Sequence, residues 1–249
     1  MPWPAGTTCT IEIEPGVASS SAHAAAIRRE WDRLRALNPR LFDAPILSAV
    51  SFTPGAIRAR TSTYQRLVVQ PVVETGTEQL SVTAVVIARD GPTPRVLLGR
   101  RGKLTRIYQE QWELGPSGGI DPPMPLPATP LTPMPMRLGW AEVCAQVRRE
   151  AAEELGNGSE SSAAANWVVP RRTWGVCRDF VARSADIVVE CDWTGPAVGD
   201  GSAPVPAGPS DQWEYERTAW LSRDEMPAFV RANRVIEPTR ALLAAMGWL

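Results

Sequence analysis

Histidine and lysine are nearly absent from this chain of 249 residues, which contains one of each, His23 and Lys103. A mechanism that needs a histidine pair, a histidine metal cluster or a buried catalytic lysine therefore has almost nothing to draw on. The four cysteines lie far apart and form no CxxC pair, so the sequence predicts neither a zinc site nor a redox motif. Carboxylates must carry any acid–base or metal chemistry.

The chain also lacks an excess of positive charge and any long hydrophobic run. Its 26 Lys and Arg residues against 27 Asp and Glu residues give a formal net charge of -1, without the clustered basic field that gathers nucleic acid or an anionic membrane. No stretch approaches about 18 uninterrupted apolar residues, and the start, MPWPAGTTCT, does not resemble a signal peptide. We therefore expect a cytoplasmic protein with reduced thiols and with neither nucleic acid nor membrane as a partner.

The composition is that of an ordinary globular protein, with 44% hydrophobic and 21% charged residues. Serines can cap a predicted helix over 19–38, and the segment 80–88 is apolar enough to be a strand buried on both faces. Strands are predicted at 8–14, 46–52, 56–62, 80–88, 95–101, 172–181, 186–193 and 214–222. Two segments are expected to be loops, the proline-rich 122–136 and 195–210. The sequence after residue 224 is predicted to be helical.

The informative segment is RREAAEELG, inside a strong helix predicted over 138–155 and stopped by Gly156. At about 100° per residue, Glu150, Glu153 and Glu154 fall within an arc of roughly 100°. Three clustered anions repel one another unless a cation compensates, and hard oxygen ligands without histidine or cysteine favour Mg²⁺ or Mn²⁺.

Two interpretations of this acidic face stay open. Such spacing is common on solvated helices, where Arg148 and Arg149 would balance the charge. The segment WELGPSGGID at 112–121 favours a ligand site, because a strand followed by a glycine-rich loop lets backbone groups approach a bound molecule.

Together these features resemble the Nudix hydrolases, whose signature is G, five residues, E, seven residues and then R-E-U-x-E-E-x-G-U, with U a bulky aliphatic residue. The matching residues are Gly119, Arg149, Glu150, Glu153, Glu154 and Gly156. The resemblance covers residues 80 to 232 approximately. It implies an α/β fold, namely an α/β/α sandwich with a mixed sheet. It also implies that the three glutamates hold Mg²⁺, with Mn²⁺ as the other candidate, helped by a backbone carbonyl around Gly118 or Gly119, and that Arg149 belongs to the catalytic machinery.

The chain departs from the family pattern in two ways. A proline-rich insert separates Gly119 from the helix, and Ala141 stands where the family has the glutamate that pairs with the signature arginine. Glu142, two helical turns before Arg149, is a candidate replacement for that partner. Since the three glutamates that would hold the metal ion are present, the resemblance implies that activity is retained.

The activity implied is hydrolysis of the pyrophosphate in a nucleoside diphosphate linked to a group X, a reaction in which metal ions neutralise phosphate oxygens and acidify water. Arg100, Arg101 and Arg106 are candidate phosphate ligands. Glu214 and Glu216 on the last strand are candidate general bases by family position. Tryptophans such as Trp112 and Trp174 bracket the expected site, and one is a candidate to stack on a base.

The residues ahead of this part favour one substrate. The segments 29–52 and 58–70 resemble the N-terminal extension of Nudix UDP-sugar diphosphatases, which implies UDP-glucose or UDP-galactose as substrate, giving UMP and a sugar 1-phosphate. The expected organisation is an α/β extension at 1–76 and a Nudix domain at 77–249. The alternatives are an ADP-ribose or dinucleotide diphosphatase and a non-catalytic nucleotide-binding module. The sequence leaves the oligomeric state open.

Overall fold

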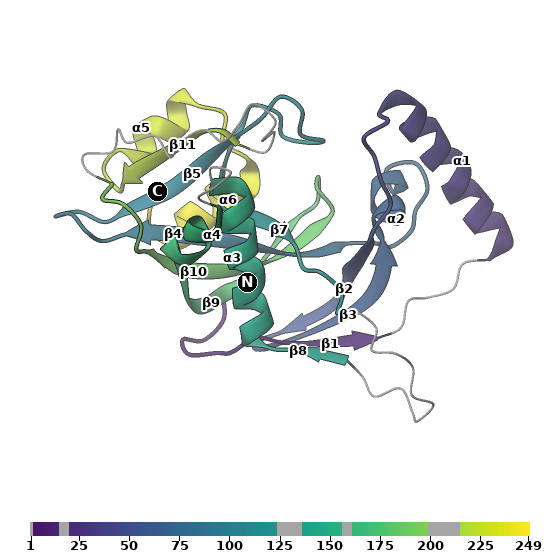
Figure 1. Cartoon of the computed structure of the whole chain (residues 1–249), viewed down its shortest axis with the longest axis horizontal. Helices are drawn as coiled ribbons and strands as arrows, with labels where there is room; N and C mark the ends of the chain where they lie inside the picture. The colour runs from purple at the N-terminus through teal and green to yellow at the C-terminus, as the bar shows by residue number, and fades with distance from the viewer. Residues whose placement is uncertain (1, 15–19, 124–135, 156–160, 199–214) are drawn as a thin grey trace.

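The computed structural model describes the chain except for residues 1, 15–19, 124–135, 156–160 and 199–214 (Figure 1). Most of both predicted loops, 122–136 and 195–210, lies outside the described residues, as does the expected helix stop at Gly156. None of the described helices is long and apolar enough to cross a membrane.

The centre of the fold is β4 (Gln79–Ala88), which belongs to a mixed sheet. It pairs in parallel with β10 (Ser184–Trp193) and antiparallel with β7 (Ser117–Gly119), and β10 continues antiparallel into β9 (Val168–Asp179). On the other side it meets β5 (Arg95–Arg101), which also carries β6 (Trp112–Leu114) and β11 (Tyr215–Ser222). The mixed sheet is therefore confirmed.

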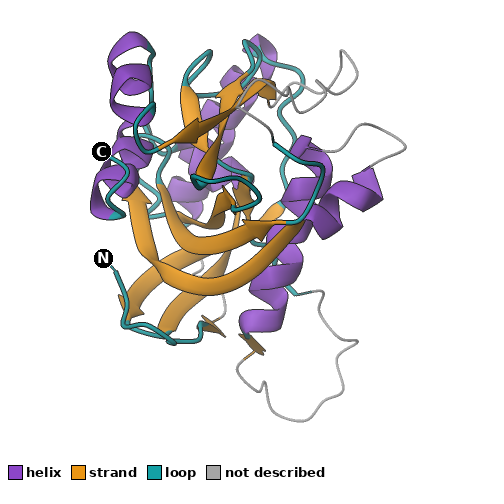
Figure 2. Ribbon diagram, turned by 90° about the vertical axis from the view of Figure 1, so that its left-hand side faces the viewer, coloured by secondary structure: helices purple, strands orange, loops and turns teal. Residues whose placement is uncertain are grey.

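The side chains of β4 alternate between two hydrophobic cores, one on each face of the sheet. Val82 and Ala84 pack with α3 (Trp140–Leu155) and α4 (Ser161–Trp167), whereas Val85 and Ile87 pack with α5 (Met226–Ala232) and α6 (Glu237–Ala245). Helices accordingly flank the strands on both sides (Figure 2). This arrangement confirms the α/β/α sandwich and explains why the predicted strand at 80–88 has almost no polar positions.

The N-terminal residues extend the same sheet and add a small core of their own. β2 (Pro45–Thr53) and β3 (Ala56–Thr63) form a hairpin, and Ser48 of β2 pairs with Gln79 of β4. β1 (Thr10–Glu14) lies between β3 and β8 (Met136–Leu138). Helix α1 (Ser21–Leu37), whose N-cap is Ser20, packs on α2 (Tyr64–Val69) through Ile27, Trp31, Val68 and Val69. In Figure 1 this unit lies beside the central sandwich.

β4 and β5 diverge, and the gap between them positions the functional site. Their pairing is confined to Ile87 with Val96 and Ala88 with Arg95, beyond which β7 follows β4 and β6 follows β5. The ring of Tyr215 fills part of this gap, since a Cβ added to Gly99 or Gly115 would lie 2.6 Å or 2.0 Å from its atoms. Glycine at both positions is what lets the tyrosine enter.

Candidate functional site

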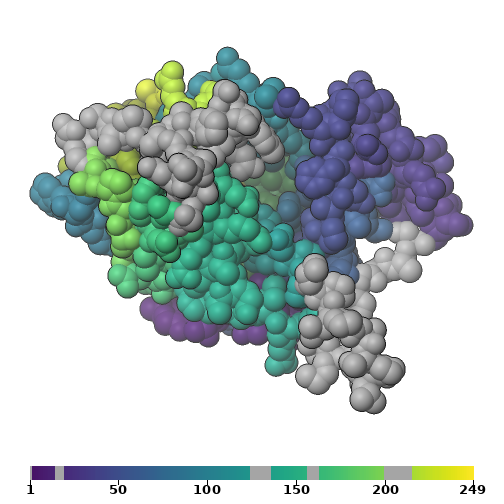
Figure 3. All heavy atoms as spheres, in the orientation of Figure 1, coloured from purple at the N-terminus to yellow at the C-terminus, as the bar shows by residue number. Residues whose placement is uncertain are grey.

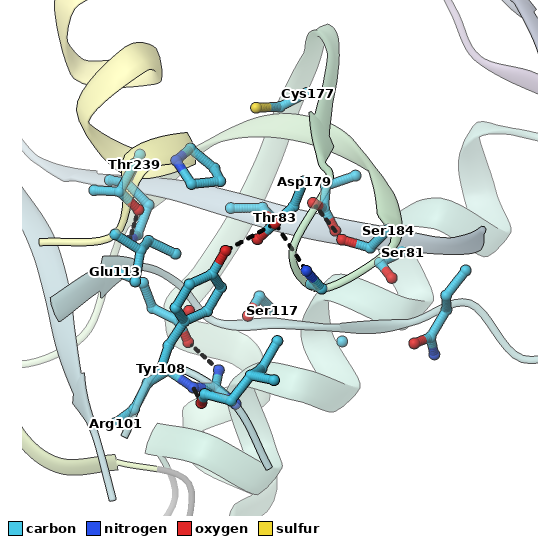
Figure 4. Close-up of a pocket in the computed structure, with 18 of the residues that line it drawn as sticks. Ser81, Thr83, Arg101, Tyr108, Glu113, Ser117, Cys177, Asp179, Ser184 and Thr239 are labelled. Carbon is cyan, nitrogen blue, oxygen red and sulfur yellow. Dashed lines mark hydrogen bonds and ion pairs between the residues drawn. The ribbon is translucent and has the colours of Figure 1, made fainter. Parts of the chain in front are cut away.

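A cavity of about 260 Å³, the first cavity, lies where β4 and β5 diverge (Figure 4). Ser81 and Thr83 of β4 form one wall, and Arg101 of β5 and Glu113 of β6 form another. Glu154 enters from α3, while the β9–β10 hairpin and the start of α6 close the remaining sides. The lining is therefore mostly polar, with charged groups of both signs.

Helix α3 brings two of the predicted glutamates against β7. Glu154 is half-buried and accepts a hydrogen bond from the backbone N–H of Ser117 at 3.1 Å. Glu150 is only 8% exposed, and a Cβ added to Gly118 would lie 2.2 Å from its carboxyl carbon. A glycine at 118 is thus required for the Glu150 carboxylate to lie against the strand.

The third predicted glutamate differs from this pair in its exposure. Glu153 is exposed and, with Glu150, lines a second cavity of about 690 Å³ next to the first. In the part of the chain that the structure describes, no group of three His, Cys, Asp or Glu side chains is arranged to hold a metal ion. The carboxylates facing β7 are hard oxygen donors, so in chemistry they fit Mg²⁺ or Mn²⁺.

Arg149 has a partner that the sequence analysis did not identify. It forms an ion pair with Asp121 at 2.8 Å and donates to the side-chain oxygen of Gln146, whose amide in turn donates to Glu150. The prediction that Glu142 is the replacement partner is wrong. Its carboxylate, in the first turn of α3, accepts a hydrogen bond from the backbone N–H of Gly139 at 2.7 Å. A carboxylate is favoured there by the unpaired N–H groups of the helix start.

The predicted arginines occupy different positions. Arg101 lines the first cavity and forms an ion pair with the buried Glu113. Burial lowers the pKa of Arg101, but the negative charges of Glu113 and Glu154 outweigh it and raise this pKa above its ordinary value. Arg100 is paired outside the cavity, with Glu110 at 3.1 Å and with Glu216 at 3.0 Å. Glu216, the candidate base, is therefore held in an ion pair.

Sequence reasoning missed the acidic end of the first cavity (Figure 4). Asp179 is buried and accepts hydrogen bonds from the hydroxyl of Tyr108 at 2.8 Å and from the N–H groups of Val181 and Ala182. Burial, together with the charges of Asp179 and Glu113, raises the pKa of Asp186 to about 7.

These groups carried no sequence signal. Asp186 reaches the cavity because β10 pairs with β4 in a register that sets it opposite Ser81, and no local motif specifies that register. The aromatic rings lining the two cavities, among the described residues, are those of Phe42, Tyr64 and Tyr108 rather than tryptophans.

Comparison with known proteins gives likenesses of fold. No family model and no curated protein matches the chain. A Nudix hydrolase from Alicyclobacillus acidocaldarius is 17% identical, with a TM-score of 0.45 over 69% of this chain and 92% of that one. The MutT protein from Methanosarcina mazei Go1 is 20% identical, with a TM-score of 0.40 over 67% and 91%.

A third similar structure is the NUDIX domain of Shewanella oneidensis NrtR complexed with ADP ribose. It is 16% identical, with a TM-score of 0.38 over 68% of this chain and 86% of that one. At such identities and TM-scores, these likenesses assign neither an activity nor a ligand to this chain.

Proposed function

We propose that this chain is a Nudix-type hydrolase that uses Mg²⁺, with Mn²⁺ as the other candidate, to cleave the pyrophosphate of a nucleoside diphosphate linked to a group X. The observation that carries the proposal is the position of Glu150 and Glu154 against Ser117–Gly119 at a polar cavity. Gly119 and the two glutamates match the two halves of the sequence signature, and they lie close in the fold although a proline-rich insert separates them in the chain.

The roles follow from charge. A diphosphate is repelled by carboxylates, so Glu150, Glu153, Glu154 and the backbone at Gly119 are proposed to hold the cation. When bound, the cation neutralises phosphate oxygens and lowers the pKa of the attacking water. Arg149 acts through another residue: it fixes Gln146, and Gln146 fixes the Glu150 carboxylate.

Substrate contacts are proposed for Gly118, Gly119 and Arg101, which line the first cavity. Arg100 as a phosphate ligand and Glu216 as a general base would both require their mutual ion pair at 3.0 Å to open. Opening it has a small energetic cost, because partly exposed pairs contribute about 0 to 1 kcal/mol.

A UDP-sugar such as UDP-glucose is the substrate we favour, giving UMP and a sugar 1-phosphate. The support is the N-terminal pattern at 29–52 and 58–70, part of which lines the second cavity through residues 38–46. Hydrolysis of ADP-ribose or a dinucleotide is the second candidate.

The test is release of monophosphate from UDP-glucose, ADP-ribose and a dinucleotide with Mg²⁺ present. We expect UDP-glucose to be turned over fastest, and Glu154→Gln to lower kcat about a hundredfold or more with an unchanged melting temperature. Glu12→Gln, which removes a surface pair with Arg137, is the matched control and should be neutral. Much faster turnover of ADP-ribose would remove the UDP-sugar assignment. Nucleotide binding that survives both chelation and Glu154→Gln, without turnover, would identify a non-catalytic module instead.

A further inference from the structure

The second cavity adjoins the first. It lies between residues 38–46 and α3, and both cavities are lined by Tyr64, Gln79, Arg106 and Gly119. In the space-filling view the segment from α1 to α2, purple to blue at the right, lies beside the rest of the molecule (Figure 3). At about 690 Å³ the second cavity falls within the roughly 300–1,000 Å³ range of small-molecule sites. A ligand at Gly119 therefore has space on both sides.

Arg106 differs from the other arginines at this junction. Arg101 and Arg149 are neutralised by Glu113 and Asp121, whereas the exposed side chain of Arg106 has no ion-pair or hydrogen-bond partner within the described part of the chain. A guanidinium group presents a planar fork of donors that matches phosphate oxygens. Since Arg106 lines both cavities, it is placed to bind an anion that lies between them.

The walls of the two cavities differ in character. The first cavity carries the carboxyl groups of Glu113, Asp179 and Asp186, which disfavour an anion deep inside it. The second has an apolar wall that includes Phe42, 72% exposed, and Leu104, 65% exposed. Large apolar side chains left exposed in a concave site are suited to contact with a flat ring.

We propose that Arg106 binds the diphosphate at the junction and that the second cavity holds the planar base of the substrate against Phe42 and Leu104. This placement leaves the polar first cavity for the uncharged, hydroxyl-bearing group on the other side of the diphosphate. The inference rests on the proposed function, in which the substrate carries a nucleoside on one side of the diphosphate and a group X on the other.

Binding of inorganic pyrophosphate and of UDP, measured by titration calorimetry with Mg²⁺, tests both parts. Arg106→Gln should weaken both probes by about tenfold to a hundredfold, as expected for a lost charge-assisted hydrogen bond. Phe42→Ser should weaken UDP by about tenfold, within the range for a stacked base, and leave pyrophosphate unchanged. The matched controls are Arg231→Gln, an exposed arginine on α5, and Phe180→Ser, 68% exposed and outside both cavities; both should bind normally.

Equal binding of both probes by Arg106→Gln and the unaltered protein would overturn the inference, as would a loss of binding confined to Arg100→Gln or Arg101→Gln. Failure of the unaltered protein to bind pyrophosphate, or to bind UDP, would overturn the inference as well. The outcome is separable from that of the proposed function. If ligands bind in a way that depends on Arg106 and Phe42 but are not hydrolysed, the proposed function is wrong and the proposed binding site stands. If hydrolysis is unaffected by either substitution, the proposed function stands and the proposed binding site is wrong.

Discussion

Replacing Asp186 with asparagine should make the protein more stable at alkaline pH. The Asp186 carboxyl lies half-buried in the first cavity, and desolvation with the nearby charges of Asp179, Glu113 and Glu78 raises its pKa from 3.8 to about 7. The hydroxyl of Ser184, at 3.1 Å, opposes the shift in part. The folded protein thus holds a proton that the unfolded chain releases near pH 4.

The sign of the effect follows from this difference. Folding stability contributed by Asp186 falls as pH rises from about 4 and levels off above about 7, where both states are ionised. Each pKa unit corresponds to about 1.4 kcal/mol. Asp186→Asn should therefore become more stable relative to the unaltered protein as pH rises. Between pH 5 and pH 8 the difference between their free energies of unfolding should grow by about 2 kcal/mol, after a discount for water that reaches the cavity.

Urea unfolding at pH 5, 6, 7 and 8, with chelator present, measures this difference. Asp32→Asn on the exposed side of α1 is the control, an aspartate removed outside the first cavity. A pH-independent difference for Asp186→Asn, or one that shrinks as pH rises, would refute the reasoning.

Three further results are expected. Gly99→Ala should lower the free energy of unfolding by about 2 kcal/mol through overpacking against Tyr215, whereas Gly91→Ala, where an added Cβ meets nothing within 4 Å, should be nearly neutral in the same urea titration. Glu113→Gln should cost about 3 kcal/mol in thermal or urea unfolding, because it leaves the charge of Arg101 without its carboxylate; unchanged stability would show that this pair is not coupled. Removing divalent ions with chelator should abolish monophosphate release, and adding back Mg²⁺ or Mn²⁺ should restore it; activity that persists in chelator would exclude the proposed mechanism.

The elements with strong periodicity could be predicted from the sequence. The strand at 80–88 becomes β4 because its apolar side chains are buried on both faces, and the helix at 138–155 becomes α3, which starts two residues later at Trp140 because Leu138 ends β8. Helix α2 (Tyr64–Val69) was missed since its six residues are too few to show a helical period. The three-residue strand β7 was missed for the same reason, whereas the strand expected at Trp112 and Glu113 is β6.

The site could be predicted only in part. The glutamates of α3 and the glycines of β7 have a spacing that resembles a known signature, so their proximity could be anticipated. The pairing of Arg149 with Asp121, and the position of Asp186 opposite Ser81, depend on how distant segments meet in space. Nothing local distinguishes Arg106 from Arg100 either, because what separates them is whether a carboxylate from another strand is near.

The parallel pairing of β4 with β10 has a consequence for biosynthesis. β4 leaves the ribosome roughly a hundred residues ahead of β10, so at about 5 to 20 residues per second its partner is missing for about 5 to 20 seconds. During that interval one edge of the most apolar strand of the nascent chain is uncovered, and such edges invite association with other chains. Expression yield in cells should therefore depend on translation speed over residues 89–183 and on the supply of chaperones.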